Sequence, residues 1–215
     1  MPTAPPTNPN ESTPLDVGAA VTVWIKICGL TGEVGILAAV RAGADAVGFV
    51  FAPSKRQVSA VRAAELGRKV PPHIMRVAVM QHPTQALLDE VWQVFRPDLL
   101  QTDWTDLAAL RIPEQLALMP VMRAGRETVA ALPARLLLEG PVSGAGSTTD
   151  WSLAALLAPR TELVLAGGLN PANVARAIEQ VRPFGVDVSS GVESAPGQKD
   201  PALIEQFISN ARTAV

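Results

Sequence analysis

From Val21 onward, short apolar runs alternate with stretches whose apolar residues recur at helical spacing. The runs are almost continuously apolar, which is typical of parallel strands that are covered on both faces. The pattern predicts strands at residues 21–27, 45–51, 75–80, 97–101, 117–122, 134–139, 162–167 and 184–189. It predicts helices between them, most clearly at 34–43, 59–70, 84–95, 170–181 and 200–212.

Eight strands with helical segments between them favour an α/β fold, a single (β/α)₈ TIM barrel over residues 21–215. An open doubly wound sheet is the alternative, but no G-x-G-x-x-G turn follows the first strand. Asn170-Pro171 and Asp200-Pro201 each combine an N-cap residue with a proline suited to the first helical position, and so predict helix starts.

Residues 1–20 are rich in Pro, Thr and Asn and contain few large apolar side chains. Such a segment buries too little surface to offset the entropy cost of ordering, so we expect a short disordered tail. It lacks the basic and apolar regions of a signal peptide.

Composition narrows the possible partners. The net charge is −2, so no basic excess points to nucleic acid or to a membrane surface. No apolar run approaches the ~18 residues of a membrane span. The single cysteine cannot form an internal disulfide, which suits a cytoplasmic location. Whether the chain is a monomer or a homodimer stays open.

The end of the first strand carries that cysteine, Cys28, two residues after Lys26. Strand alternation places both side chains on one face. A neighbouring ammonium lowers the pKa of a thiol, so Cys28 is a candidate general base. The alternative is a small buried hydrophobic residue.

Two other strand ends carry charge. Arg56 follows the second strand, where it is either a bidentate ligand for a carboxylate or phosphate or a solvated surface charge. Glu139 follows three leucines, and a carboxyl group at the edge of an apolar run is a candidate general acid because its pKa tends to be raised.

Small residues follow the last two strands, namely Gly167, Gly168, Ser190 and Gly191. In barrels of this class such loops bind phosphate, so they favour a phosphorylated small-molecule ligand. The alternative is tight packing that requires glycine. We expect no metal and no cofactor, because the sequence has neither a metal-ligand cluster nor a nucleotide-binding loop.

Several segments resemble phosphoribosylanthranilate isomerases, namely KICGLT at 26–31, GADAVGFVFAPSKR at 43–56, DW at 150–151, AGGLNPANVARAI at 166–178 and GVDVSSGVESAPGQKD at 185–200. The resemblance implies a (β/α)₈ enzyme of tryptophan biosynthesis. Its reaction is an Amadori rearrangement of N-(5-phosphoribosyl)anthranilate to 1-(2-carboxyphenylamino)-1-deoxyribulose 5-phosphate, without a cofactor. It also implies that Cys28 is the base, that Arg56 contacts the anthranilate group, and that Gly167, Gly168, Ser190 and Gly191 bind the phosphate.

Three strand ends depart from the family pattern. Glu139 stands where the family has an aspartate as general acid, and Asp103 replaces a histidine. Asp103 is therefore an alternative acid, or else a solvated loop charge. The third strand ends in Met80, Gln81 and His82 instead of Phe-Val-Asn. These changes leave two other functions open, an isomerase acting on a related phosphosugar amine and a non-catalytic barrel that binds a phosphorylated ligand. The retained Cys28 favours catalysis.

Overall fold

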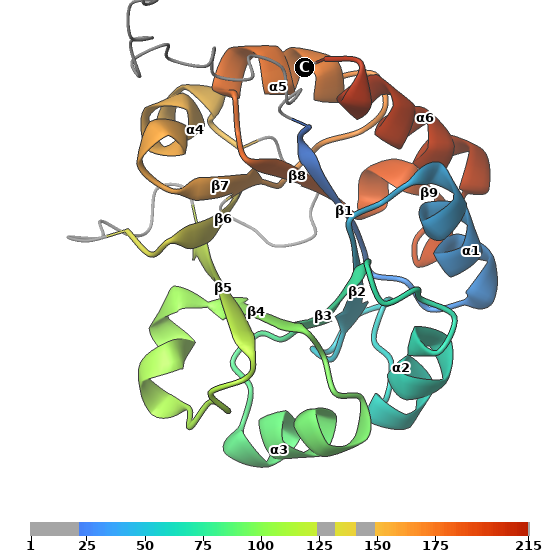
Figure 1. Cartoon of the computed structure of the whole chain (residues 1–215), viewed down its shortest axis with the longest axis vertical. Helices are drawn as coiled ribbons and strands as arrows, with labels where there is room; N and C mark the ends of the chain where they lie inside the picture. The colour runs from blue at the N-terminus through green and yellow to red at the C-terminus, as the bar shows by residue number, and fades with distance from the viewer. Residues whose placement is uncertain (1–21, 124–131, 141–148, 215) are drawn as a thin grey trace, which may run out of the picture.

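The computed structural model describes residues 22–123, 132–140 and 149–214, so the expected tail at 1–20 lies outside the described residues. Parallel strands form a closed barrel in the order β1 to β8, and β8 pairs with β1 to complete it (Figure 1). The barrel prediction is confirmed, and the open sheet is excluded. The strands are β1 Trp24–Cys28, β2 Ala46–Val50, β3 Met75–Val79, β4 Leu99–Asp103, β5 Ala117–Arg123, β6 Arg135–Glu139, β7 Glu162–Leu165 and β8 Gly185–Val188.

Helices surround the strands (Figure 1). The α-helices are α1 Glu33–Ala42, α2 Ala60–Gly67, α3 Gln85–Val94, α4 Trp151–Leu157, α5 Val174–Val181 and α6 Pro201–Arg212. Shorter elements are the 3₁₀ helices η1 Trp104–Ala109, η2 Ala158–Arg160 and η3 Ser190–Val192, and the hairpin strands β9 Glu193–Ala195 and β10 Gln198–Lys199. The link from β4 to β5 therefore contains only η1 in place of an α-helix.

One of the two predicted helix starts is confirmed. The Asp200 carboxylate accepts hydrogen bonds from the amides of Ala202 and Leu203 and caps α6. The prediction at Asn170-Pro171 is wrong, because α5 begins at Val174. The Asn170 side chain instead accepts from the amide of Ala172, a local turn that competes with helix initiation.

Alternation along the strands divides the apolar side chains into two cores. The outer core fills the space between the strands and the helices. The smaller inner core lies inside the barrel and contains Val77, Leu99, Met119 and Leu137.

Lys26 and Asp187 are buried polar side chains beside this inner core, and they are neighbours in the register of β1 and β8. A Cβ atom added to Gly48 of β2 would lie 3.1 Å from Cε of Lys26 and 3.0 Å from Sγ of Cys28. Glycine at this strand position therefore makes room for the lysine and the thiol.

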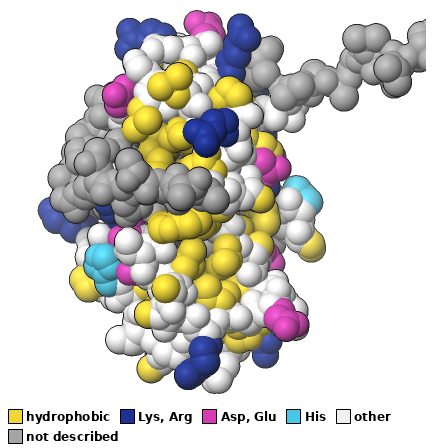
Figure 2. All heavy atoms as spheres, turned by 90° about the vertical axis from the view of Figure 1, so that its left-hand side faces the viewer, with side chains coloured by type: hydrophobic (Ala, Val, Ile, Leu, Met, Phe, Trp, Pro, Cys, Tyr) yellow, Lys and Arg dark blue, Asp and Glu magenta, His cyan; other side chains and the backbone are white. Residues whose placement is uncertain are grey.

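The outer surface mixes side-chain types. Figure 2 shows hydrophobic side chains on the side of β5, β6 and α4, with Lys and Arg side chains scattered among the described residues of that face. Leu118 of β5 and Leu156 of α4 are among the exposed large hydrophobic residues. Within the described ranges, no helix has the length and apolar character needed to cross a bilayer.

Candidate active site

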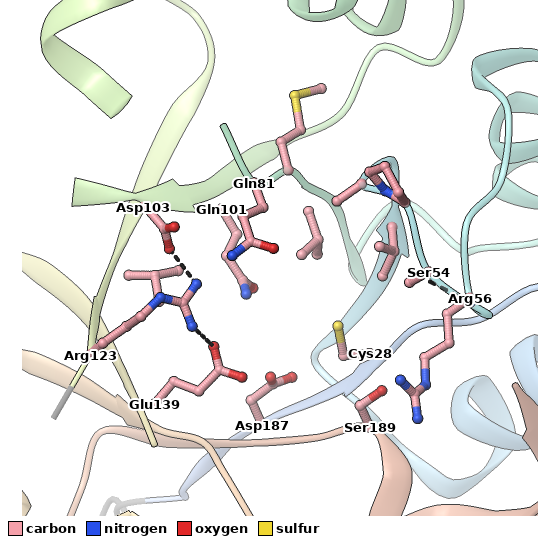
Figure 3. A pocket seen from close by; sticks show the side chains of 16 residues that line it. Cys28, Ser54, Arg56, Gln81, Gln101, Asp103, Arg123, Glu139, Asp187 and Ser189 are labelled. Carbon is pink, nitrogen blue, oxygen red and sulfur yellow. Dashed lines mark hydrogen bonds and ion pairs between the residues drawn. The ribbon is translucent and has the colours of Figure 1, made fainter. Parts of the chain in front are cut away.

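A cavity of about 230 Å³ lies where the strands end, on the carboxyl side of the barrel (Figure 3). Cys28, Arg56, Asp103 and Glu139, which the sequence singled out on four different strands or loops, all line it. Its other polar lining residues are Ser54, Gln81, Gln101, Arg123, Asp187 and Ser189. In Figure 3, Asp103, Arg123 and Glu139 lie on one side, and Cys28, Ser189 and Arg56 lie on the other.

Cys28 is held beside a buried ion pair. The Lys26 ammonium donates to Oδ1 of Asp187 at 2.7 Å, and the lysine is fully buried. Burial alone would lower the pKa of Lys26, but Asp187 and Cys28 outweigh it and the pKa is raised. The lysine therefore stays charged.

The same surroundings raise the pKa of the Cys28 thiol. Burial is the largest cause, and the opposing attraction of Lys26 does not outweigh it. Lys26 lowers the pKa of the thiol, as the sequence predicts, but burial raises it by more. The cation is in place, but the desolvation of the thiolate costs more.

Arg56 reaches the cavity across Gly29, which has φ +74°. A Cβ atom on Gly29 would lie 2.5 Å from Cδ of Arg56, so the glycine that follows Cys28 makes room for the arginine. The guanidinium donates to both carboxylate oxygens of Glu193, at 2.7 and 2.8 Å. This bidentate contact fixes the plane of the guanidinium.

Glu193 also accepts from Nζ of Lys199 at 2.6 Å. Burial would raise the pKa of Glu193, but the hydrogen bonds from Arg56 and Lys199 lower it to about 2. Burial lowers the pKa of Lys199, and Glu193 offsets only part of that effect. Arg56 is thus supported by a carboxylate that stays ionised.

On the opposite side of the cavity, Arg123 lies between two carboxylates. Its Nη2 donates to Oδ1 of Asp103 at 2.6 Å, and its Nη1 donates to Oε2 of Glu139 at 3.2 Å. The register of β5 and β6 places Arg123 directly beside Glu139. His82 approaches the other oxygen of Asp103 at 3.7 Å and binds Asp106 at 2.9 Å, and this Asp106 contact is the main cause of the raised pKa of His82.

The four residues predicted to bind phosphate lie around the ends of β7 and β8. Gly167 and Gly168 have φ values of +91° and +68°, which glycine adopts without strain. A Cβ atom on Gly191 would lie 1.9 Å from the carbonyl oxygen of Leu169, so this glycine packs the two loops together. None of the four is among the residues that line the central cavity, although Ser190 lines a neighbouring hollow with Arg56 and Glu193.

Reasoning from the sequence missed Arg123, Asp187, Glu193 and Lys199. Two of them carried a signal. Asp187 interrupts the apolar strand β8, and Arg123 is the charged end of β5. Alternation would have placed each on the inner face of its strand. Glu193 and Lys199 belong to the β9–β10 hairpin. Glu193 pairs with Arg56, which is distant in the sequence, so no local sequence pattern predicts this contact.

A parallel barrel whose polar cavity lies at the carboxyl ends of its strands has the architecture of the (β/α)₈ enzymes. Residues 25–210 match the model of one family within this class, N-(5'-phosphoribosyl)anthranilate (PRA) isomerase. The chain belongs to this family.

Individual relatives agree with the family model. The chain is 43% identical to the N-(5'-phosphoribosyl)anthranilate isomerase of Pseudomonas aeruginosa over 207 residues, which cover 89% of this chain and 96% of that protein. The enzyme from Pelobacter propionicus is 37% identical, with 88% and 96% covered.

Solved structures are similar as well. The phosphoribosyl anthranilate isomerase of Thermotoga maritima has a TM-score of 0.75 and 34% identity, covering 89% of this chain and 100% of that chain. A phosphoribosyl anthranilate isomerase in complex with reduced 1-(o-carboxyphenylamino)-1-deoxyribulose 5-phosphate has a TM-score of 0.73 with the same identity and coverage.

Proposed function

We propose that this chain isomerises N-(5-phosphoribosyl)anthranilate to the corresponding 1-deoxyribulose 5-phosphate in tryptophan biosynthesis, with Cys28 as general base and Glu139 as general acid. The observation that carries the assignment is that both groups line one cavity, from different sides of the barrel mouth (Figure 3). Family membership supports the reaction itself.

The two groups account for the proton transfers. Glu139 donates a proton to the ribose ring oxygen, the bond between that oxygen and C1 breaks, and the anthranilate nitrogen forms an iminium at C1. Cys28, as the thiolate, removes the C2 proton that the iminium has acidified. The enolamine then tautomerises to the ketone. Because the product is an isomer of the substrate, no atom or electron is gained or lost overall.

Arg56 is proposed to bind the anthranilate carboxylate. Glu193 accepts from its Nε and Nη2 and holds the guanidinium in one orientation. Among the contacts between described residues, Nη1 of Arg56 stays available to a carboxylate in the cavity. A positioned guanidinium binds a carboxylate with defined geometry, which aligns C1 and C2 of the sugar with the acid and the base.

The phosphate is proposed to bind at the ends of β7 and β8, to the backbone amides of Gly167, Gly168, Ser190 and Gly191. Gly167 and Gly168 lack side chains that would keep a phosphate away from the backbone. The 3₁₀ helix η3 begins at Ser190, and the free amides at the start of a helix favour an anion. This placement leaves the ribose over the central cavity and the phosphate at its edge.

Location and assembly belong to the same proposal. A catalytic thiolate must stay reduced, so we place the protein in the cytoplasm. A Thermotoga maritima structure with 35% identity is described as monomers generated from a dimeric phosphoribosylanthranilate isomerase, and this chain is proposed as a monomer or a homodimer. Light scattering coupled to size-exclusion chromatography would decide between the two.

The decisive experiment is turnover of freshly prepared N-(5-phosphoribosyl)anthranilate, followed by the loss of its anthranilate-type fluorescence. Cys28→Ala and Glu139→Gln are each expected to lower kcat by about 10²–10⁴-fold, the usual contribution of a general base or acid. Asp98→Asn is the control, because Asp98 pairs with Arg76 at the amino end of the strands, away from the cavity.

Other outcomes would contradict specific parts of the proposal. Activity that survives Glu139→Gln but not Asp103→Asn would assign the acid role to Asp103. No turnover with retained binding of a product analogue would indicate a non-catalytic phospholigand-binding barrel. Turnover of a different phosphosugar amine only would change the substrate.

A further inference from the structure

Asp103, Arg123 and Glu139 form a connected row along three adjacent strands, β4, β5 and β6. Their side chains are 8%, 9% and 14% exposed, so they interact with little screening by solvent. One arginine therefore serves two carboxylates at once, and the acid proposed above is one of them.

The two contacts of Arg123 are unequal. The contact to Asp103 is 2.6 Å long, whereas the contact to Glu139 is 3.2 Å long. A shorter charge-assisted hydrogen bond is the stronger one, so the guanidinium is engaged mainly by Asp103. Arg123 therefore attracts the Glu139 carboxylate less strongly than it would without Asp103.

The weaker interaction between Arg123 and Glu139 matters for a general acid. A cation that bound Glu139 alone would favour the ionised carboxylate, which has no proton to give. When Glu139 holds its proton, Arg123 and Asp103 still balance each other in charge, so the buried cation keeps a partner.

We propose that Asp103 is a positioning residue of the isomerase: it holds the Arg123 guanidinium and thereby limits how tightly Arg123 binds the Glu139 carboxylate. The proposal rests on the proposed role of Glu139 as the acid. Asp103 is then neither an alternative acid nor a solvated loop charge. One of its oxygens accepts from the guanidinium, and the other lies 3.7 Å from Nε2 of His82.

The remaining charges around this row are fixed by other partners. Asp187 lines the same cavity but accepts from Lys26. Arg56 is engaged by Glu193, and His82 by Asp106. Cys28 is the other titratable group of the cavity, and it lies on the far side from Glu139 (Figure 3). Among the described residues, Arg123 is the cation next to Glu139.

The test is the pH profile of kcat for Asp103→Asn. Because the pKa of the Cys28 thiol is raised and lies above that of a carboxyl group, the acidic limb of the profile reports Glu139. The neutral side chain frees Arg123 to bind Glu139 fully, so this acidic limb is expected to move to lower pH by about one unit or more, and the plateau value of kcat is expected to fall. KM is expected to change less than kcat. Asp98→Asn is the control, because it removes the carboxylate that pairs with Arg76 at the other end of β4. This variant is expected to leave the pH profile unchanged.

Arg123→Gln provides a second variant with the opposite sign. Removing the cation leaves Asp103 and Glu139 as neighbouring carboxylates, so the acidic limb is expected to move to higher pH. If Asp103→Asn does not fold, the direction of this shift decides the proposal. A limb that stays at the parent pH in either folded variant overturns it, as does loss of turnover at every pH in Asp103→Asn.

Glu139→Gln separates this proposal from the proposed function. Full activity in that variant refutes Glu139 as the acid, whatever Asp103 does. Loss of activity in Glu139→Gln together with an unmoved profile in Asp103→Asn refutes only the positioning role.

Discussion

The Cys28 thiol is subject to two opposed effects, burial that raises its pKa and a buried ammonium that lowers it. The balance favours the thiol form, so the proposed base is strong but sparsely ionised near neutral pH. A base of raised pKa accepts a carbon-bound proton more readily once it is ionised. The site thus combines a protected thiol with a cation that stabilises the thiolate when it forms.

This balance predicts how Cys28 reacts with iodoacetamide. Cys28 is the single cysteine, so alkylation reports on it alone. In the folded protein, the midpoint of the rise in alkylation rate with pH is expected to lie above the midpoint for the urea-unfolded chain, which is ~8.5 for an ordinary thiol. The midpoint reports the pKa, whereas limited access changes only the height of the plateau. A midpoint at or below that of the unfolded chain would contradict the raised pKa.

At this scale the sequence identified the residues but not their partners. Cys28, Arg56 and Glu139 are predicted because strand ends are readable from hydrophobic periodicity. Asp103 is predicted only from the resemblance to the family, as the residue that replaces a histidine. The net pKa of Cys28 depends on the depth of its burial, and the role of Asp103 depends on Arg123, which is 20 residues away. Neither the pKa of Cys28 nor the role of Asp103 can be predicted from a local sequence pattern.

At the scale of elements, the loops after β7 and β8 are locked together at Gly191. The carbonyl oxygen of Leu169 lies where a side chain would begin. The phosphate proposed at these loops would therefore bind to two strands at once, and its affinity would depend on their spacing.

Gly191→Ala is accordingly expected to raise KM by about tenfold or more, because a backbone shift must separate the two loops before the methyl group fits. Steady-state kinetics on the same substrate would measure it. Gly32→Ala is the matched control, since no atom lies within 4 Å of its added Cβ and its φ is −143°. Equal KM values in the two variants would remove Gly191 from the phosphate site.

The elements themselves were largely readable from the sequence. The apolar runs located the barrel strands to within a few residues, since each must be covered on both faces. The start of α5 was misplaced because Asn170 forms a side-chain turn that resembles a cap. The 3₁₀ helix after β4 is not predicted by the sequence, because it is too short to show a repeating pattern of apolar residues.

At the scale of the whole molecule, Glu193 joins the β9–β10 hairpin to the loop after β2 through Arg56, and it also accepts from Lys199 within the hairpin. Its folded-state pKa of about 2 is below its ordinary value of 4.5. A carboxyl group with a lowered pKa stabilises the fold above its unfolded-state pKa, and this contribution is lost as the pH falls through the folded-state value.

The free energy of unfolding of Glu193→Gln is therefore expected to be lower than that of the parent at pH 7, and the difference is expected to shrink between pH 4.5 and about 2. Urea unfolding across this range would measure it. Glu162→Gln removes the partner of Arg135 in an ion pair whose carboxylate is 48% exposed, and it is expected to have little effect at any pH. A constant difference for Glu193→Gln would contradict the lowered pKa.

The buried pair of Lys26 and Asp187 has a consequence for how the chain folds while it is being translated. The two residues are 161 positions apart, so the lysine leaves the ribosome long before its partner is translated. A growing chain that buried Lys26 early would bury a charge without its counterion, which is costly. We therefore expect β1 to stay unpaired on its β8 side until β8 has been synthesised. The Cys28 thiol then becomes buried only when synthesis is almost complete.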